Sequence, residues 1–592
     1  MRGAALAAAT IAALLAAPGA GAAPVDDLIA SCAARSSGDQ RPVAHRVCEG
    51  RLPSFDGTEL DVTLTLPARR PRGRRRQPLV VFLHGLLSSK REYLSETAAG
   101  DGPDRGGDIY KTVEWNNVWF ASRGYAVLSY SARGHGDSAG SIELASRDIE
   151  VRDTHHLTGL LVDHRWPKLD PNRVAVLGSS YGGGQAWLLL ATSGEGARDP
   201  GTWRSPAGRL VRLAAVVPQY TWTDLLYSLA PNGRQRTDAA PDPATSGEPI
   251  GVAKQTLING FVATSQGKLP DYSLRWIART NAGEPYEGDP AVAEARHGLT
   301  VERSAYHQDG FFRWLRSGRR ARVPVLAAQG WTDPIFAPVE TLRMYRRLRE
   351  SSRGYPIQVY LGDFEHLTAQ VKVPDLLYLH RLGNRMIDHF LKRKGRRPRF
   401  DVRSAQTLCD RAAFGPVVRA RDWDALAPGR LRLELGGPRQ TASPLSDPRA
   451  ASTDPVVVSQ QAGRGCITTT LGRTAGVAAY EVPLDGAVEM AGMPLLRLRY
   501  RAAAPDIQLN SRLWDVAPDG RQTLVSRGAY RAVAPDPAGA DAEYELFGNH
   551  WRFEEGHRLL LEVTQDDSPF FRRDNFAGSA TIESAELVLP VR

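Results

Sequence analysis

Cysteine and long apolar runs are both scarce in this chain. Among 592 residues there are four cysteines, and none of them shows a C-x-x-C or Cys/His spacing of the kind that binds structural zinc. Beyond the N-terminal segment, no apolar run reaches the roughly 20 residues that a bilayer requires. No tandem repeat or low-complexity tract is present. These absences argue against zinc-ribbon, polytopic membrane and repeat proteins, and we expect neither a metal nor another cofactor.

The N-terminal segment MRGAALAAATIAALLAAPGAGAA has the pattern of a secretory signal peptide. One positive charge precedes an Ala/Leu/Ile run, and an A-x-A-like cleavage site follows at Ala20-Gly21-Ala22. We therefore expect a signal over residues 1–22. The mature protein is predicted to be secreted or extracytoplasmic, without a membrane span once the signal has been cleaved.

The cysteines are predicted to form disulfides. An even number of cysteines in an exported chain favours such bonds. Three connectivities are possible, and proximity along the sequence favours Cys32–Cys48 and Cys409–Cys466.

Basic residues exceed acidic residues without forming a patch in the sequence. Lys and Arg number 75 against 65 Asp and Glu, which gives a net charge of +10, carried mainly by Arg. Such a balance can serve binding to nucleic acids or anionic surfaces. Because the arginines are scattered along the chain, we interpret the excess as compositional and expect no nucleic-acid partner.

The length of the chain implies two or three domains. From about residue 43 to residue 395, short apolar runs alternate with amphipathic ones, which predicts a mainly parallel α/β sheet. Residues 56–68 alternate at period two, as expected of a half-buried edge strand in a hairpin. The predicted buried strands are 78–85, 125–134, 173–180, 212–219, 323–330 and 356–363, and the predicted helices are 149–165, 338–351 and 376–395.

Two later segments depart from this alternation. Between residues 219 and 323 the predicted helices 249–265 and 309–318 indicate a helical insertion over one end of the sheet. After residue 395, short β-rich runs lie between Gly, Pro and Asp turns. Their regular spacing predicts a β-sandwich or jelly roll.

The segment Gly178-Ser179-Ser180-Tyr181-Gly182 fits G-x-S-x-G between an apolar strand and a helix. This context is that of a nucleophile elbow. The sharp turn needs small residues two positions before and two positions after the nucleophile. Centring the motif on Ser180 places glycine at both positions, whereas centring it on Ser179 places Leu177 and Tyr181 there. Ser180 is the predicted nucleophile, and Ser179 a turn residue.

A nucleophilic serine needs a base and a carboxylate that orients the base. In this arrangement they follow in the order Ser, acid, His, each at the carboxyl end of a strand. Asp333 follows the predicted strand 323–330, and His366 follows 356–363. The other histidines after Asp333 lie in the predicted helix 376–395 or in the β-rich region: His380, His389, His550 and His557.

We therefore predict the triad Ser180, Asp333 and His366. Asp363 and Glu365 remain alternatives for the acid, although both lie close to His366 along the chain. We expect the oxyanion to be bound by two backbone N–H groups. These belong to Tyr181, at the start of the helix, and to Leu86, in a loop that His84 is expected to shape.

These residues resemble the CocE/NonD hydrolases of the X-Pro dipeptidyl-peptidase superfamily. The resemblance rests on SYSARGHGDSAG, LGSSYGGG, the Trp-x-Asp of QGWTDPIF and the loop that carries His366. The segments LWDVAPDGRQTLVSRGAYR (513–531) and GHRLLLEVTQDDSPFFRRDN (556–575) are similar to the C-terminal domain of that family. Together these pieces extend from about residue 43 to residue 590.

The resemblance implies an α/β-hydrolase fold with a helical cap insertion, followed by an all-β jelly roll of the galactose-binding type. We place the hydrolase domain at residues 23–220 and 319–400, the cap at 221–318 and the jelly roll at 401–592. Ser180, Asp333 and His366 match the triad of the family. Several members have a tyrosine hydroxyl as an oxyanion donor, whereas this chain has His84-Gly85-Leu86 at that place.

The resemblance further implies serine hydrolysis of X-Pro dipeptides, acyl esters or α-amino acid esters. We expect a dipeptidyl-peptidase acting on a peptide or ester substrate; an acyl or α-amino acid esterase is the alternative. A non-catalytic surface or glycan-binding protein is a third hypothesis, against which the ordered triad argues. An aminopeptidase needs a carboxylate for the substrate ammonium and an aromatic pocket for proline, and the candidates are Tyr220, Trp222, Asp224 and Trp331.

Overall fold

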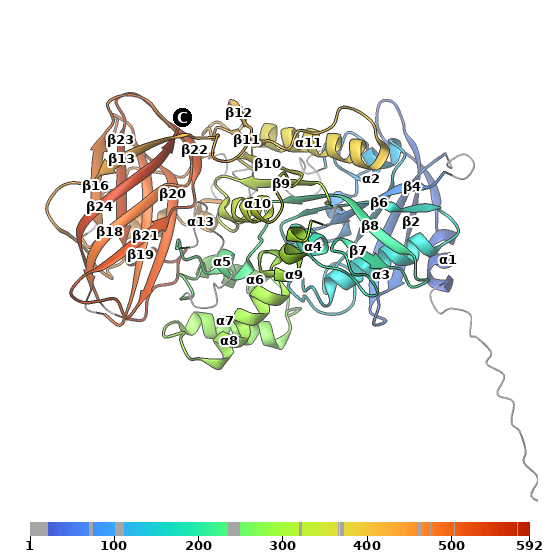
Figure 1. Cartoon of the computed structure of the whole chain (residues 1–592), viewed down its shortest axis with the longest axis horizontal. Helices are drawn as coiled ribbons and strands as arrows, with labels where there is room; N and C mark the ends of the chain where they lie inside the picture. Colours follow the sequence, from blue (N-terminus) through green and yellow to red (C-terminus); the bar gives the residue numbers. More distant parts are fainter. Residues whose placement is uncertain are drawn as a thin grey trace, which may run out of the picture.

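The structure is a computed structural model, and it consists of an α/β part beside an all-β part (Figure 1). The predicted signal peptide lies outside the described residues except for its last position, Ala22, which begins helix α1 (Ala22–Ala30). The structure describes residues 22–69, 75–100, 112–234, 249–318, 322–364, 366, 372–459, 465–473, 475–502, 504–576 and 578–592.

In the α/β part, twelve of the described strands form one sheet. Its order is β1-β2-β3-β5-β4-β6-β8-β9-β10-β11-β12, with β7 paired to β8. Along this order from β5 to β11, each strand runs parallel to the next. The predicted parallel sheet and its six buried strands are confirmed. The bounds are β1 Ala33–Ser36, β2 Ala44–Pro53, β3 Glu59–Pro67, β4 Gln77–Leu83, β5 Ala126–Tyr130, β6 Leu169–Ser179, β7 Thr202–Arg204, β8 Leu210–Gln219, β9 Val325–Gly330, β10 Ile357–Gly362, β11 Val402–Ala405 and β12 Val417–Ala420.

Both faces of the central strands are covered by helices. Successive side chains of a strand point to opposite faces, so in β4 Val80 and Val81 enter different hydrophobic cores. Val80 packs on the side of α2 (Asn117–Ser122) and α11 (Val373–Lys392). Val81 packs on the side of α3 (Glu150–Asp163), α4 (Tyr181–Ala191) and α10 (Val339–Ser351). The continuous apolar runs of these strands are therefore explained by burial on two faces.

Strand β3 differs from its prediction as a half-buried edge strand. It pairs with β2 as a hairpin, but it also pairs with β5, so it lies inside the sheet. The polar residues that made its pattern alternate are buried as well. Asp61 forms an ion pair with Lys90 (2.7 Å), and Thr65 accepts a hydrogen bond from Asn117 at the start of α2 (3.0 Å). Buried polar partners thus produce the same alternation as a solvent-exposed face.

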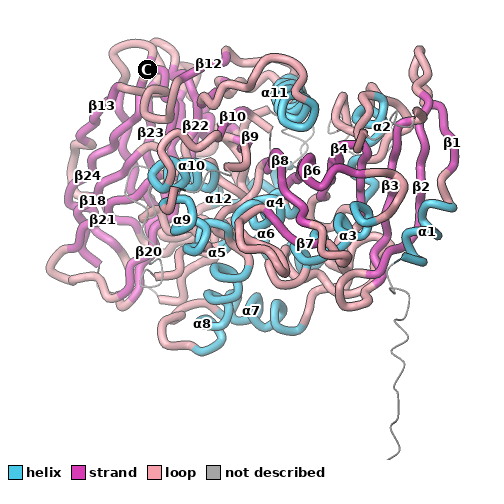
Figure 2. The backbone as a smooth tube through the Cα atoms, turned by 45° about the vertical axis from the view of Figure 1, so that its right-hand side comes forward, coloured by secondary structure: helices cyan, strands magenta, loops and turns pink. Residues whose placement is uncertain are grey.

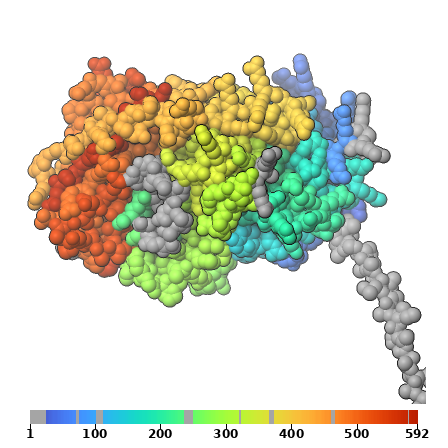
Figure 3. All heavy atoms as spheres, viewed as in Figure 1, coloured from blue at the N-terminus to red at the C-terminus, as the bar shows by residue number. Residues whose placement is uncertain are grey.

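The segment between β8 and β9 is helical, and we refer to it as the cap. The predicted helix 309–318 corresponds to α9, and the predicted helix 249–265 corresponds to α6, which begins only at Gln255. Helices α7 and α8 lie at the bottom of Figure 2, and in Figure 3 the light-green atoms of the cap form the lower surface beside the all-β part. The bounds are α5 Leu225–Leu229, α6 Gln255–Thr264, α7 Asp271–Ala282, α8 Pro290–His297, η2 Gly298–Glu302, η3 Ala305–His307 and α9 Asp309–Arg316.

The all-β part consists of two antiparallel sheets that enclose a separate hydrophobic core. One sheet has the order β21-β18-β24-β17-β22, with β13 and β14 also paired to β24, and the other has the order β15-β20-β19-β23-β16. The predicted jelly-roll class is confirmed. The bounds are β13 Gly429–Glu434, β14 Gln440–Ala442, α12 Pro448–Ser452, α13 Pro455–Ser459, β15 Thr468–Thr469, β16 Ala478–Pro483, β17 Val488–Gly492, β18 Leu495–Ala502, β19 Asp506–Val516, β20 Gln522–Val533, β21 Ala540–Glu545, β22 Asn549–Phe553, β23 Arg558–Thr564 and β24 Ala580–Val591.

The boundary between the two parts lies later than the predicted residue 401. Strand β11 pairs in parallel with β10, and β12 pairs with β11, so both extend the large sheet. The first strand of the jelly roll is β13, which begins at Gly429. A short β-rich run can pair with either domain, so composition alone did not reveal which sheet it joins.

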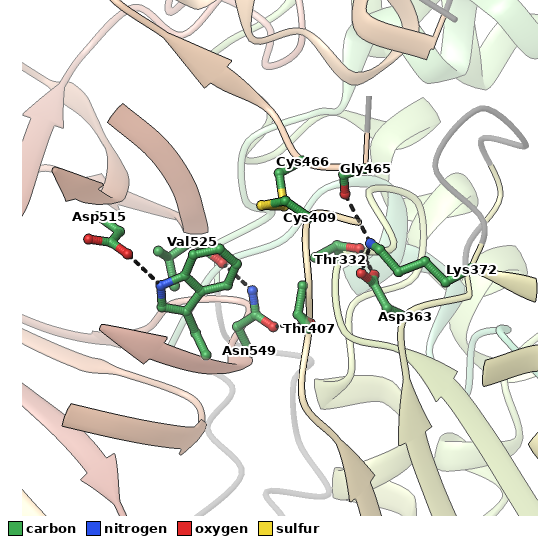
Figure 4. Close-up of a disulfide and its surroundings, with 11 residues drawn as sticks. Thr332, Asp363, Lys372, Thr407, Cys409, Gly465, Cys466, Asp515, Val525 and Asn549 are labelled. Atoms are coloured by element: carbon green, nitrogen blue, oxygen red, sulfur yellow. Dashed lines mark hydrogen bonds and ion pairs between the residues drawn. A yellow bond between two sulfur atoms is a disulfide. The ribbon is translucent and has the colours of Figure 1, made fainter. Parts of the chain in front are cut away.

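Both predicted disulfides are present. Cys32–Cys48 joins the end of α1 to β2, and Cys409–Cys466 joins the loop after β11 to the segment before β15 (Figure 4). The second bond therefore connects the large sheet to the jelly roll. None of the helices in the described ranges has the length and apolarity needed to span a bilayer.

Removing either disulfide should lower the free energy of unfolding. The chain-entropy model gives about 3 kcal/mol for the bond with a separation of 16 residues and about 4 kcal/mol for the bond with a separation of 57. The paired variants Cys32→Ser/Cys48→Ser and Cys409→Ser/Cys466→Ser should therefore both unfold at lower guanidinium concentration. A variant as stable as the parent chain would contradict this expectation for that bond.

Candidate active site

Ser180 occupies a sharp turn between β6 and α4. Its backbone has φ 51° and ψ −115°, a conformation that side-chain-bearing residues rarely adopt. A Cβ atom at Gly178 would lie 2.2 Å from the carbonyl oxygen of Gly182, and one at Gly182 would lie 2.1 Å from that of Leu83. The small residues on either side of Ser180 are therefore a steric requirement of this turn, as the motif predicts.

The structure brings the three residues of the predicted triad together. His366 Nδ1 lies 2.7 Å from Asp333 Oδ2, and His366 Nε2 lies 2.7 Å from Ser180 Oγ. Each residue follows a different parallel strand, namely β6, β9 and β10. The carboxyl ends of parallel strands meet at one edge of the sheet, which explains how residues so distant in sequence converge.

Asp333 is held in a fixed orientation. Its Oδ1 accepts hydrogen bonds from the N–H groups of Ile335 (2.9 Å) and Phe336 (3.0 Å), which leaves Oδ2 for His366. A carboxylate only accepts hydrogen bonds, so Nδ1 of His366 is the donor. Nε2 therefore presents its lone pair to the Ser180 hydroxyl, which is the arrangement required of a general base.

Of the two alternative acids, Asp363 lies among the described residues, and its partners are groups other than His366. Asp363 forms an ion pair with Lys372 and accepts a hydrogen bond from Thr332. Its carboxylate is thus engaged away from His366, whereas Asp333 contacts the imidazole directly. Glu365 lies outside the described residues.

The loop after β4 lies against the nucleophile turn. The N–H group of Gly182 donates to His84 O (3.0 Å), and a Cβ atom at Gly85 would lie 3.7 Å from Ser180 Cβ. His84 Nδ1 donates to Gly85 O (2.7 Å), and its Nε2 accepts from the N–H group of Ala132 (2.8 Å). Burial lowers the pKa of His84, which favours the neutral ring that this pattern needs. His84 thus shapes the loop, as expected.

The predicted oxyanion donors flank Ser180 on two elements. Tyr181 is the first residue of α4, and Leu86 follows Gly85 in the loop beside Ser180. The hydroxyl of Tyr181 donates to Glu150 in α3, which directs its side chain away from the turn. What these two residues can offer a substrate at Ser180 is therefore their backbone N–H groups.

Glu92, in the short helix η1 (Lys90–Tyr93), joins the two segments around Ser180. Its Oε1 accepts from the hydroxyl of Ser179 (2.6 Å), and its Oε2 accepts from the N–H group of Gly85 (2.7 Å). Sequence reasoning missed this residue because it lies in an irregular segment and matches no motif. Ser179, predicted as a turn residue, also ties the turn to the loop after β4.

Two of the four candidate substrate-binding residues lie beside the triad. The ring of Tyr220 lies edge-on to His366 with 5.3 Å between ring centroids, and Phe336 contacts the same imidazole at 5.0 Å. Trp222 packs edge-on against Tyr181 at 6.2 Å. Its Nε1 donates to the carbonyl of Arg303, so it presents only its ring to neighbouring groups.

The other two candidates are engaged inside the protein. Asp224 is 1% exposed, caps α5 through the N–H of Tyr227 and accepts a hydrogen bond from His307 (2.8 Å). Trp331 is 1% exposed, and its Nε1 donates to Ser404 (3.0 Å). Neither side chain is available to a substrate ammonium or a proline ring. In both cases, the polar or aromatic residue that follows a strand packs inside the protein.

A polar cluster connects the residues that follow β9 and β10 to the segment beside the second disulfide (Figure 4). Thr332 donates to Asp363, and Lys372 pairs with Asp363 while it donates to Gly465 O (2.9 Å). Gly465 is adjacent to Cys466 of the second disulfide. On the other side of Asp333, Lys254 of the cap donates to Ile335 O (2.7 Å), and burial lowers the pKa of its amine to about 7. Both the cap and the jelly roll thus support the loops that carry the triad.

Two protein-family models match the chain. That of the X-Pro dipeptidyl-peptidase (S15 family) matches residues 56–199, and that of the X-Pro dipeptidyl-peptidase C-terminal non-catalytic domain matches residues 417–588. The first segment contains Ser180 and the loop after β4. The second corresponds to the jelly roll, and together the two segments cover more than half of the chain.

Solved structures share this architecture over nearly the whole length. A CocE/NonD family hydrolase from Staphylococcus aureus is 12% identical, with a TM-score of 0.60 over 95% of this chain and 97% of its own. An α-amino acid ester hydrolase is 15% identical, with a TM-score of 0.60 over 93% and 97%. An aminopeptidase from a marine-sediment Thaumarchaeota archaeon is 14% identical, with a TM-score of 0.58 over 95% and 97%.

One curated relative matches part of the chain. The quorum-quenching protein AidA of Acinetobacter baumannii (strain MDR-ZJ06) is 26% identical over 286 residues, which are 48% of this chain and 79% of that protein.

Substitution of Gly182 should destabilise the fold. The Cβ atom of Gly182→Ala would meet the backbone of β4 and displace it, as overpacking does at a cost of about 1–3 kcal/mol. Gly260→Ala in α6 is the matched control, because no atom lies within 4 Å of its Cβ position. Helix propensity should make that control slightly more stable than the parent chain. Guanidinium unfolding measures both, and equal stabilities of the two variants would contradict the expectation.

Proposed function

The chain belongs to the X-Pro dipeptidyl-peptidase (S15) superfamily of serine hydrolases, and we propose that it cleaves amide or ester bonds through Ser180, Asp333 and His366. The observation that carries this proposal is the continuous hydrogen-bonded series from Asp333 through His366 to Ser180. The protein is a hydrolase by its family. The triad is our assignment of the residues that perform the reaction.

In the proposed reaction, Ser180 Oγ attacks the substrate carbonyl while His366 Nε2 accepts the hydroxyl proton. Asp333 stabilises the imidazolium that forms. The N–H groups of Tyr181 and Leu86 donate to the oxyanion of the tetrahedral intermediate. His366 then gives its proton to the departing amine or alcohol, which leaves an acyl-enzyme on Ser180. Water, deprotonated by His366, attacks the acyl-enzyme ester; the bond from the acyl carbon to Ser180 Oγ then breaks, His366 returns the proton to Oγ, and the carboxylic acid leaves.

The sequence favours an X-Pro dipeptidyl-peptidase, and the structure offers one observation in favour of an esterase. A dipeptidyl-peptidase must pair the ammonium of its substrate with an acceptor. Asp224, the predicted acceptor, is buried and bonded to His307 and the start of α5. An acyl ester without an ammonium needs no such partner. The esterase is therefore the second candidate, favoured by the position of Asp224.

Export remains part of the proposal. It is supported by the signal-like N-terminal sequence and by the two disulfides, which persist in oxidising compartments. The alternative of a non-catalytic binding protein is disfavoured, because such a protein would not need a carboxylate, a histidine and a serine that are hydrogen-bonded in series.

Labelling with a fluorophosphonate tests the assignment of the nucleophile. The parent protein should be labelled, and Ser180→Ala should lose the label, because the hydroxyl that donates a hydrogen bond to His366 Nε2 in this arrangement is that of Ser180. Ser179→Ala is the matched control and should keep most of the label. Absence of label on the parent protein would contradict catalysis, and equal loss in Ser179→Ala would contradict the choice of serine.

Parallel assays of an X-Pro p-nitroanilide and a p-nitrophenyl ester distinguish the two substrate classes. We expect ester hydrolysis that is lost in Ser180→Ala, because the acyl-enzyme forms more readily from an activated ester. Cleavage of the anilide at a comparable kcat/KM would support the dipeptidyl-peptidase. Cleavage of the ester alone would exclude it and leave the esterase.

A further inference from the structure

A cavity of about 120 Å³ lies between the cap and the loop after β4. Leu86 and Leu87 of that loop line one side, and Leu144 lines another. Ile142 adds to the side of Leu144, and the cap contributes Phe261 of α6, Trp276 of α7 and further apolar side chains. The proposed oxyanion donor Leu86 is thus also a residue of the chamber wall.

The polar side chains in the wall of the chamber are bonded within the cap. Ser265 donates to Val262 O (2.8 Å), Ser273 donates to Pro270 O (2.8 Å), and Thr280 donates to Trp276 O (2.9 Å). Arg279 forms an ion pair with Asp289 (2.6 Å). Because these hydroxyl groups and this guanidinium already have partners within the cap, the lining of the chamber suits a neutral apolar group.

We propose that this chamber binds the acyl chain of the substrate, and that the substrate is an ester of a neutral aliphatic carboxylic acid. The inference rests on the proposed function, since it requires Ser180 to attack the carbonyl at the mouth of the chamber. An aliphatic chain gains free energy for each methylene group removed from water. An α-ammonium group would be buried there without a partner, which is unfavourable.

The chamber fits the acyl side of the ester rather than the alcohol side. His366 must protonate the leaving group, so the alcohol lies beside the imidazole. Tyr220 and Phe336 contact that imidazole, and neither belongs to the wall of the chamber. Leu86, the proposed oxyanion donor, is instead among the residues that line the chamber. The substituent that enters it is therefore the one that remains on Ser180 in the acyl-enzyme.

A series of p-nitrophenyl esters from acetate to dodecanoate tests the inference. Burial of a methylene group is worth up to about fourfold, so kcat/KM should rise at least tenfold from acetate to octanoate. The p-nitrophenyl ester of 2-aminooctanoic acid should react at least tenfold more slowly than the octanoate, because its ammonium group would be buried against the same apolar lining.

Filling the chamber should remove this preference. Ala295 of α8 lines the cavity, so Ala295→Phe should lower the ratio of octanoate to acetate kcat/KM at least tenfold. Ala293 is exposed on the same helix, and Ala293→Phe is the matched control that should keep the parent ratio. If Ala295→Phe does not fold, the chain-length series on the parent protein still decides.

The outcomes separate this inference from the proposed function. An active enzyme with equal kcat/KM for acetate and octanoate, or with a preference for the amino ester, would overturn the acyl chamber and leave the serine hydrolase standing. A protein that neither reacts with fluorophosphonate nor hydrolyses any ester would overturn both. Equal ratios in Ala295→Phe and Ala293→Phe would show that the chain binds elsewhere.

Discussion

The close contact between the start of α4 and the end of β4 is the constraint on which the proposed site depends. A Cβ atom at Gly182 would lie 2.1 Å from Leu83 O, and the N–H group of Gly182 donates to His84 O. This contact allows the left-handed turn at Ser180 and brings the loop of Leu86 beside it. Glu92 then joins the two segments through Ser179 and Gly85. Direct contacts and hydrogen bonds thus join the segment of the nucleophile to the loop of Leu86.

The cap and the jelly roll stabilise the remainder of the site from outside the sheet. Lys254 of the cap binds the turn after Asp333, and Lys372 joins Asp363 to Gly465 beside the second disulfide. The two outer parts are also connected to each other, because Arg572 pairs with Glu284 (2.6 Å). Buried charges of this kind are paired because an isolated charge is costly away from water. Contacts from both the cap and the jelly roll therefore support the loops of the α/β part that carry the proposed triad.

Much of this architecture could be predicted because it follows from local patterns. Two-sided burial makes the central strands continuously apolar, the turn at Ser180 demands its glycines, and sequence proximity paired the cysteines correctly. Prediction failed where a polar residue had a buried partner. Strand β3 resembled an edge strand because Asp61 and Thr65 are polar, although Lys90 and Asn117 satisfy them inside the protein. Asp224 suggested a ligand for an ammonium for the same reason.

By itself, the sequence determined the fold class, the elbow with Ser180 and the order of the acid and base candidates, since each depends on residue type at fixed spacing along one strand, turn or helix. Only the tertiary structure decided that Asp333 rather than Asp363 contacts His366, that Glu92 connects both sides of Ser180, and that the cap leaves an apolar chamber beside Leu86. These features arise between elements far apart in the chain. Their geometry is set by packing, which spacing along the sequence does not contain.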